Sequence, residues 1–353
     1  MAEKSNPFPT VEETLKHPAY PTAIWKLVPH KKGRAPVAEG RGGPFNIGWE
    51  IHGSGPTKLV MIIGLGSFCV AWQCQTLYFG HEKGDQYSVL LIDNRGMGNS
   101  DVPLMRYSTS EMALDVLEVA THVGWTDRHS LHVVGISLGG MIAQEVACAS
   151  PERIASLALL STAAEIRNTD SFLVNLQNRA ALLIPRGIEV SVGGSAKRIF
   201  AHDWLEAPDR FRLPTKDSPK VEMPEGGEYL RFNSNYQRFV AQEMHKRLDK
   251  ERFGSTGFLL QLIAAGWHYK NREQLSEMAD AVGRDRILVL HGTVDEMISV
   301  PHGKILIDFI KPKTGVILEN AGHGIPLERT EWLNNFLEEH LQSVLQLDSP
   351  PKP

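Results

Sequence analysis

A serine between closely spaced glycines is the feature of the sequence that most directly suggests chemistry. The segment Gly135-Ile136-Ser137-Leu138-Gly139 follows an apolar run and precedes a helix-like stretch. A G-x-S-x-G sequence in that context places its serine on a sharp turn between a strand and a helix. Minimal side chains two residues either side of the serine let the strand and the helix approach each other. We therefore expect Ser137 to be a nucleophile at the carboxyl end of a sheet.

A serine hydroxyl becomes reactive only when a base takes its proton. His323 is the preferred base among the 14 histidines, because Gly322 and Gly324 flank it after a late apolar run and let its loop reach over the sheet edge. The alternative bases, in less suitable contexts, are His291, His302, His268 and His132.

The base in turn needs an acid that fixes its tautomer. Asp295 follows the apolar run 286–290, in a turn that would direct its carboxylate to the carboxyl end of the sheet. Glu296 and Glu165 are the alternative acids. The order along the chain is then Ser137, Asp295 and His323, which is the order of one serine hydrolase fold and not of the other two well-known arrangements.

Two hydrogen-bond donors should hold the negative charge that develops on the substrate oxygen. One is expected to be the backbone amide of Leu138, at the start of the helix after the serine. For the other we nominate the amide of Leu65, because Gly64-Leu65-Gly66 follows an early apolar run and the second donor of such sites comes from a loop of this kind. A simple tight turn is the alternative interpretation of these glycines.

The segment Asp93 to Ser100 is rich in glycine but lacks the third glycine of a dinucleotide-binding fingerprint. It is predicted to be a scaffold turn, in which Asp93 and Arg95 hold the loop under the site rather than take part in catalysis.

The elements that must position these residues alternate along the chain. Strand-like apolar runs lie at 47–51, 58–63, 87–92, 130–134, 154–160, 286–290 and 315–318, and helix-like segments at 110–123, 141–149 and 331–347. This alternation indicates an α/β fold with a mostly parallel central sheet flanked by helices.

The alternation of strand-like and helix-like segments is interrupted between Ser137 and the other two candidate residues. Because Ser137 precedes the interruption and Asp295 and His323 follow it, both flanks must form one sheet. We expect an irregular proline-rich arm at 1–45, a core of 46–162 and 283–347, an inserted helical cap at 163–282 and a tail at 348–353. The apolar residues of the cap, expected mainly to form its own core, include Phe172, Leu173, Leu182, Leu183, Phe200, Trp204, Phe232 and Tyr236.

Composition disfavours several classes of function. Lys and Arg number 37 against 41 Asp and Glu, which argues against a nucleic-acid partner. The most apolar run, Leu59 to Leu65, is far shorter than the roughly 20 residues that span a bilayer, and no export signal is visible. With three cysteines at no metal-binding spacing and no H-E-x-x-H sequence, we expect no metal and no other cofactor, and a cytoplasmic location.

Four motifs together resemble the α/β-hydrolase superfamily, in its branch of serine esterases and lactonases. They are Gly135 to Gly139, Asp93 to Ser100, His291 to Asp295 and Gly322-His323. Within that branch, bacterial-type methylesterases and enol-lactonase-like hydrolases are resembled by Ile63 to Ser67 with Trp72, Asp93 to Arg95 and Ser137 to Gln144. Many members of the superfamily carry a histidine before the oxyanion-loop glycine, where this chain has Ile63. Its epoxide hydrolases and haloalkane dehalogenases carry an aspartate at the position of Ser137, which disfavours both activities.

The resemblance implies a cap that lies over the serine and shapes the choice of substrate. It also implies a cofactor-free serine hydrolase that cleaves a carboxylic ester, thioester or lactone through an acyl-enzyme. The same triad could instead cleave an amide or a carbon–carbon bond, or transfer an acyl group. A small-molecule receptor with weak turnover is the alternative from another class. The aromatic content of the cap mildly favours an apolar or aromatic substrate.

Overall fold

The computed structural model describes residues 8–166 and 187–348 of the chain. Eight strands form one sheet in the order β10-β9-β7-β6-β4-β5-β3-β2. The strands from β10 to β5 run parallel, and β3 and β2 are antiparallel to their neighbours. Their bounds are β2 Lys31–Val37, β3 Phe45–Gly53, β4 Thr57–Ile62, β5 Tyr87–Ile92, β6 Leu131–Ile136, β7 Ile154–Leu160, β9 Ile287–Gly292 and β10 Thr314–Leu318. The expected α/β fold is confirmed.

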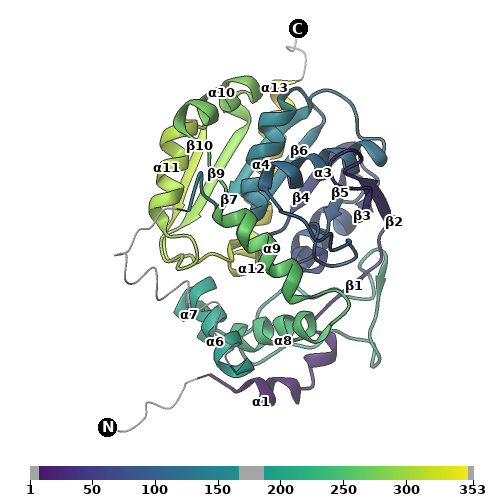
Figure 1. Cartoon of the computed structure of the whole chain (residues 1–353). Helices are drawn as coiled ribbons and strands as arrows, with labels where there is room; N and C mark the ends of the chain where they lie inside the picture. The colour runs from purple at the N-terminus through teal and green to yellow at the C-terminus, as the bar shows by residue number, and fades with distance from the viewer. Residues whose placement is uncertain (1–7, 167–186, 349–353) are drawn as a thin grey trace.

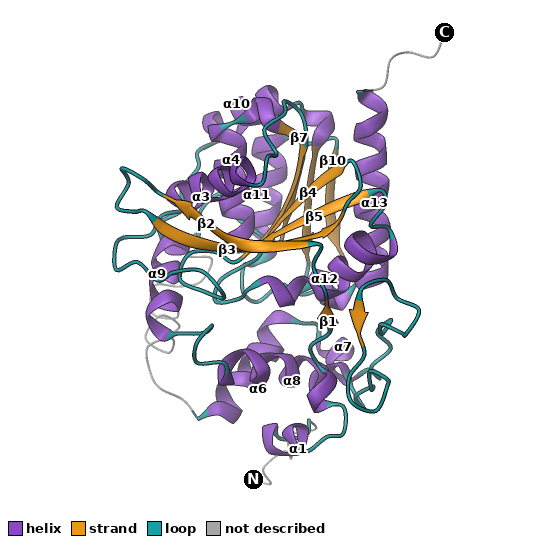
Figure 2. Ribbon diagram, turned by 90° about the vertical axis from the view of Figure 1, so that its right-hand side faces the viewer, coloured by secondary structure: helices purple, strands orange, loops and turns teal. Residues whose placement is uncertain are grey.

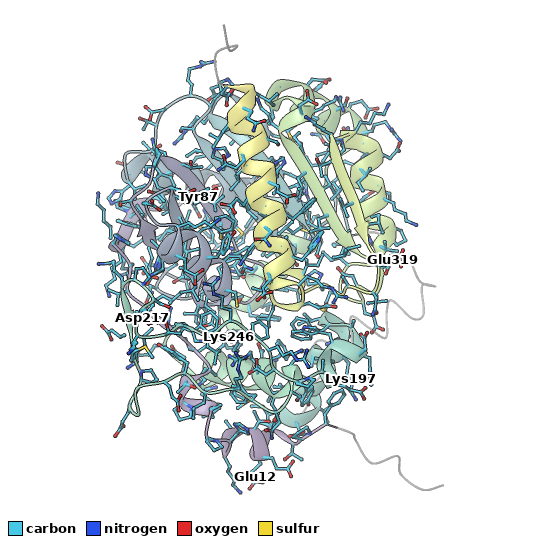
Figure 3. All side chains as sticks on the ribbon, turned by 180° about the vertical axis from the view of Figure 1, so that it is seen from behind. Glu12, Tyr87, Lys197, Asp217, Lys246 and Glu319 are labelled. Carbon is cyan, nitrogen blue, oxygen red and sulfur yellow. The ribbon has the colours of Figure 1, made fainter. Side chains whose placement is uncertain are left out.

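Helices cover both faces of this sheet (Figures 1 and 2). One face carries α3 (Thr109–His122), α4 (Leu138–Ala149), α10 (Arg272–Val282) and α11 (Val300–Ile310). The other carries α13 (Thr330–Leu347) and the helical segment Thr76–Glu82. Figure 3 shows α13 from behind, lying along the sheet.

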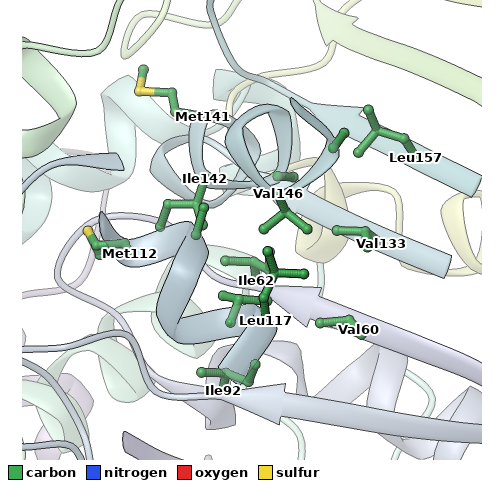
Figure 4. Close-up of a cluster of buried hydrophobic side chains, with 14 of the residues drawn as sticks. Val60, Ile62, Ile92, Met112, Leu117, Val133, Met141, Ile142, Val146 and Leu157 are labelled. Carbon is green, nitrogen blue, oxygen red and sulfur yellow. The ribbon is translucent and has the colours of Figure 1, made fainter. Parts of the chain in front are cut away.

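The strands are apolar on both sides, as expected of a sheet that is buried between two helical layers. In β4, Val60 and Ile62 pack toward α3 and α4, and the cluster that they join is drawn in Figure 4. Leu59 and Met61, which alternate with them, pack on the α13 side. Successive side chains of a strand point to opposite faces, so one continuous apolar run supplies both layers of the core.

The expected irregular arm at residues 1–45 is wrong for much of its length. β2 (Lys31–Val37) pairs with β3 in the main sheet, and α1 (Val11–Leu15) packs on the cap with Val11 buried. Pro36 did not prevent strand formation because β2 is the edge strand, where a residue that cannot donate a hydrogen bond is tolerated. Only Ala35 and Val37 of β2 are buried, too short a pattern to reveal the strand in advance.

The described part of the insertion, called the cap from here on, lies mostly below the sheet in Figure 1, although its residue Ala264 packs in the same apolar cluster as α3 and α4. It contains α6 (Ile188–Ile199), α7 (His202–Glu206), α8 (Asn235–Leu248) and α9 (Ser255–Gly266). The short strand β8 (Val221–Glu222) pairs with β1 (Lys26–Leu27), which ties the cap to the N-terminal segment. Phe200, Trp204, Phe232 and Tyr236 pack in apolar clusters of this region, whereas Phe172, Leu173, Leu182 and Leu183 lie outside the described residues.

The end of the cap expected at residue 282 needs correction. Leu275, Met278, Ala279 and Val282 of α10 are buried in the same apolar cluster as α3 and α4. α10 therefore belongs to the helical layer on the sheet, beside α11 (Figure 1). Its amphipathic pattern looks the same whether the partner is a cap or a sheet, so the sequence alone placed it on the wrong side of the boundary.

Candidate active site

Ser137 stands between the last residue of β6 and the first residue of α4. Its backbone has φ 57° and ψ −124°, a conformation that costs a residue with a side chain about 1–3 kcal/mol. The turn is held from both sides, because the Ser137 carbonyl accepts hydrogen bonds from the Thr162 hydroxyl at 2.7 Å and from the Gly140 amide at 3.0 Å. The half-buried serine is thus fixed in a strained turn.

The two glycines of the motif are required by space. A Cβ atom added to Gly135 would clash with the carbonyl oxygen of Gly139, and one added to Gly139 would clash with the carbonyl oxygen of Ile62. In both cases the obstacle is backbone, which cannot rotate away as a side chain could. The close approach of strand and helix expected from the sequence is therefore present.

The predicted base and acid meet in a buried pair. Nδ1 of His323 lies 2.7 Å from Oδ2 of Asp295, and the two residues are 8% and 4% exposed. Because a carboxylate can only accept, the neutral imidazole carries its proton on Nδ1 and leaves Nε2 free to take another. Asp295 follows β9, and His323 follows β10, so neighbouring parallel strands deliver the two loops to one edge of the sheet.

Several donors hold the Asp295 carboxylate in its charged form. Oδ1 accepts from the backbone amides of Met297 and Ile298, each at 2.8 Å. Burial alone would raise the pKa of Asp295, but the His323 charge and the hydrogen bonds from His291 and His323 outweigh it and hold that pKa well below its usual value. The carboxylate is thus charged at neutral pH and orients His323.

His291, considered as a base from the sequence, lies behind the acid. It is fully buried, and its Nε2 is 2.6 Å from the Ile298 carbonyl and 3.3 Å from Oδ2 of Asp295. Both neighbours are acceptors, so Nε2 must carry the proton. His291 supports Asp295, and nothing in the sequence separated this role from that of a base.

The three remaining candidate bases make hydrogen bonds away from Asp295. His132 lies in β6 with Nδ1 2.8 Å from the Ser156 hydroxyl, and His268 contacts the Thr109 hydroxyl at 2.9 Å. His302 is in the first turn of α11, with Nδ1 3.0 Å from the Ser299 carbonyl.

The two carboxylates considered in place of Asp295 have different surroundings. The backbone of Glu165 pairs with that of Tyr269 in an isolated antiparallel β-bridge, and Glu296 is exposed beside the cap. Asp295 is therefore the acid that the structure brings to His323.

The nominated oxyanion loop runs past the serine. A Cβ atom added to Gly64 would lie 3.1 Å from Cβ and 3.6 Å from Oγ of Ser137, which places the backbone beside Leu65 next to the hydroxyl. The amide of the following residue, Gly66, is already used, because it donates to Oε1 of Gln261 at 2.9 Å. Leu138 is the first residue of α4, where helix amides have no partner within the helix.

Gln261 is a functional candidate that sequence reasoning missed. It is fully buried in α9, and its Nε2 donates to the Arg95 carbonyl at 2.9 Å while Oε1 receives the Gly66 amide. One side chain therefore joins the nominated oxyanion loop to the glycine-rich turn after β5. Its signal in the sequence was a lone polar residue inside the apolar run Phe258 to Ile263.

The turn Asp93 to Ser100 has the geometry of a scaffold. Asp93 is buried and accepts from the amides of Cys69 at 2.7 Å and Asn99 at 2.8 Å. Arg95 is buried and holds Asp115 of α3 through Nε at 2.6 Å and Nη2 at 2.7 Å. Both charged side chains are used to tie this turn to its surroundings.

Within residues 8–166 and 187–348, no group of three or more His, Cys, Asp or Glu side chains is arranged to hold a metal ion. The helices of the same residues include none that is both long and apolar enough to cross a membrane.

Comparison with known proteins identifies the family of this fold. The family model described as "alpha/beta hydrolase fold" matches residues 59–330. The chain belongs to this family. The match takes in both flanks of the insertion and all of the candidate residues, and the resemblance noted from the motifs is confirmed.

Relatives within this α/β-hydrolase family include lactone- and carbamate-cleaving enzymes by name. The chain is 26% identical over 280 residues to 3-oxoadipate enol-lactonase 2 of Acinetobacter baylyi, covering 79% of this chain and 86% of the lactonase. It is 30% identical over 165 residues to the putative carbamate hydrolase RutD of Azorhizobium caulinodans, which covers 46% of this chain and 58% of RutD.

Solved structures share the fold. The enol-lactonase of Burkholderia xenovorans LB400 superposes with a TM-score of 0.63 and 19% identity, covering 88% of this chain and all of that one. At this level of identity the likeness shows the common α/β-hydrolase architecture and leaves the substrate to be argued from the site.

Proposed function

We propose that this chain, a hydrolase that acts on ester bonds, works through a Ser137, His323 and Asp295 triad. The observation that carries the proposal is the buried His323–Asp295 pair, with 2.7 Å between Nδ1 and Oδ2, at the same sheet edge as a serine in a strained turn. A histidine with a purely structural role needs neither a charged acid at one ring nitrogen nor a second ring nitrogen that is free to take a proton. This arrangement is that of a base prepared to accept a proton.

In the proposed mechanism the Ser137 oxygen attacks the ester carbonyl while its proton passes to Nε2 of His323. The carbonyl electrons move to oxygen, where the amides of Leu138 and Leu65 donate hydrogen bonds. When the tetrahedral intermediate collapses, the C–O bond to the leaving alcohol breaks and His323 returns the proton to that oxygen. A water molecule then repeats the sequence on the acyl-enzyme and releases the acid.

We propose a carboxylic ester, thioester or lactone as the substrate, with an apolar or aromatic group. The enol-lactonase relatives support a lactone, whose ring opening gives a single product. We further propose that residues 46–162 and 272–347 form the catalytic core and that most of the insertion between them acts as a cap. In this account the cap binds the part of the small-molecule substrate that lies away from the carbonyl.

The triad is tested with a Ser137→Ala variant. Its turnover of an activated ester such as a p-nitrophenyl acylate should fall by roughly a millionfold, with unchanged folding by circular dichroism. Ser110→Ala is a matched control, because Ser110 lies on the exposed first turn of α3 and its variant should keep full activity. Turnover by Ser137→Ala at the rate of this control would sink the assignment.

The choice of bond is tested by comparing substrates. The native protein should hydrolyse simple esters and lactones faster than matched amides and vinylogous diketones. Faster cleavage of the diketone would point to carbon–carbon hydrolysis, and product formation that shifts to an added alcohol would point to acyl transfer. A protein that binds these compounds without turning any over would favour the receptor.

A further inference from the structure

The two loops that carry the acid and the base both reach the end of a cap helix. The amide of Glu296, next to Asp295, donates to the Arg198 carbonyl at 3.3 Å, and the amide of Gly324, next to His323, donates to the Ile199 carbonyl at 3.0 Å. Arg198 and Ile199 are the last two residues of α6. The final carbonyls of a helix have no partner within it, so the catalytic loops satisfy the C-terminal end of α6.

The contact leaves no space between helix and loop. A Cβ atom added to Gly322 would clash with the Ile199 carbonyl oxygen, and one added to Gly324 would clash with the Phe200 ring. Phe200 in turn packs in the cap cluster with α8. The glycines on either side of His323 thus let the loop lie directly against the cap.

A buried carboxylate fixes the same loop from the core side. Glu328 ends the short helix α12 (Ile325–Glu328) and is 5% exposed. Its Oε2 accepts from the amide of Gly322, the residue before His323, at 2.8 Å. Burial raises the pKa of Glu328, whereas the amides of Gly322 and Ala201 and the charge of Arg329 act in the opposite direction.

Glu328 therefore ties α12 of the core to the base loop at the point where that loop meets the cap. A carboxylate is costly to bury unless it is hydrogen-bonded, and the partner of Oε2 is the amide of Gly322. Gly322 itself lies against the Ile199 carbonyl at the end of α6.

We propose that Glu328 is a positioning residue for His323. Through its hydrogen bond to the base loop, Glu328 couples the seating of α6 on the core to the alignment of the His323–Asp295 pair. The inference rests on the proposed triad. With α6 seated, the base loop is held through Gly322 and Gly324 on either side of the imidazole. If α6 moves away, Gly324 and Glu296 lose their acceptors together, and both catalytic loops are released.

Contacts across the boundary between core and cap support this coupling. Figure 3 shows Glu319 of the core and Lys197 of the cap on opposite sides of this boundary. Beside them, the Asn320 side chain donates to Oδ2 of Asp203 in α7 at 2.7 Å, and Arg329 donates to the Asn320 carbonyl at 2.6 Å. The residues just before His323 are thus also linked to the cap.

Glu328→Ala and Glu328→Gln test the proposal, with Glu331→Gln as the control. Glu331 is three residues further on and exposed. Glu328→Gln retains one acceptor oxygen for the Gly322 amide and replaces the other oxygen, which has no hydrogen-bond partner among the described residues, with an NH₂ group. Glu328→Ala should lower kcat by about ten- to a hundredfold with little change in KM, as expected when a reacting group is displaced by about 1 Å. Glu328→Gln should lose less, and the control nothing.

A second readout reports the His323–Asp295 hydrogen bond without turnover. Its proton should give a low-field NMR resonance in the native protein, assigned by its loss in Asp295→Asn. The resonance should broaden or shift in Glu328→Ala, change less in Glu328→Gln and stay in place in Glu331→Gln.

The outcomes separate the two proposals. An unchanged resonance together with an unchanged kcat per folded molecule in Glu328→Ala would overturn the positioning role. Should Glu328→Ala fail to fold, Glu328→Leu, which keeps a side chain of similar volume without the acceptor, decides by the same two readouts. An altered resonance in a protein whose Ser137→Ala variant is fully active would instead leave the positioning role standing and reject the triad.

Discussion

Replacing Gln261 with leucine should damage the oxyanion loop without touching the triad. Leucine has a similar volume, but it removes the acceptor of the Gly66 amide and the donor to the Arg95 carbonyl, both at 2.9 Å in the native protein. A buried polar group left without a partner costs about 1–3 kcal/mol. The loop can regain part of this by turning the Gly66 amide toward another acceptor, and that movement shifts the neighbouring Leu65.

The catalytic loss follows from the displaced donor. Complete loss of one oxyanion donor costs about 2.7–4 kcal/mol, or a factor of about 10²–10³ in kcat. Because Gln261→Leu displaces Leu65 rather than removing it, we expect kcat to fall by about ten- to a hundredfold. KM should change little, since the donors bind the transition state more strongly than the substrate.

The assay compares kcat, KM and the affinity for a trifluoromethyl ketone, which forms a tetrahedral adduct with an active serine. Inhibitor affinity should fall in parallel with kcat/KM in Gln261→Leu. Gln346→Leu, the same change at an exposed position of α13, should behave as the native protein. A folded Gln261→Leu protein with native kcat and native inhibitor affinity would refute the role of this side chain.

Three further predictions follow from the same geometry. The free energy of unfolding, measured with urea, should be about 1 kcal/mol higher for Ser137→Gly than for Ser137→Ala, because relief of the strained φ of 57° exceeds the entropy cost of glycine; lower stability of the glycine variant would contradict the strain. Asp295→Asn should fold normally yet lose about 10⁴-fold in kcat, because the amide no longer fixes the His323 tautomer; activity near the native level would show that the pair is not catalytic. Burial lowers the pKa of His132 to about 4, so the unfolded chain takes up its proton first, and stability should be complete above about pH 6.5 and fall toward pH 4 by on the order of 3 kcal/mol; an equal slope in His132→Gln would assign the loss to other groups.

The local motifs could be read from the sequence because their requirements are local. The close backbone contacts of one strand–helix junction require glycine at 135 and 139. Such contacts therefore produce a fixed spacing of glycines in the sequence. Asp295 and His323 each follow an apolar strand by a few residues, and parallel strands deliver such loops to a common edge. The order of residues and the alternation of elements were therefore enough to pair Asp295 with His323 and to place Ser137 at the same edge of the sheet.

The parts that were missed depend on long-range packing. β2 is a strand because β3 pairs with it at the sheet edge, and its own composition argues against it. The Gln261 side chain binds the backbone of a loop that is remote in the sequence. The Glu328 side chain binds a loop that lies just before it in the sequence. The only sign of Gln261 in the sequence was a single polar residue in an apolar run, and Glu328 resembles any other acidic residue of a short helix. α10 has the same pattern of apolar residues that a cap helix would have.

The central claim is that Ser137 is a nucleophile activated by His323, and covalent labelling tests it most directly. The protein is treated with a fluorophosphonate, digested, and the modified residue is located by mass spectrometry. A single phosphonyl adduct on Ser137, absent in Ser137→Ala and formed far more slowly in His323→Ala, is the predicted result. Ester turnover by a protein whose Ser137 stays unmodified, or labelling at the native rate without His323, would contradict it.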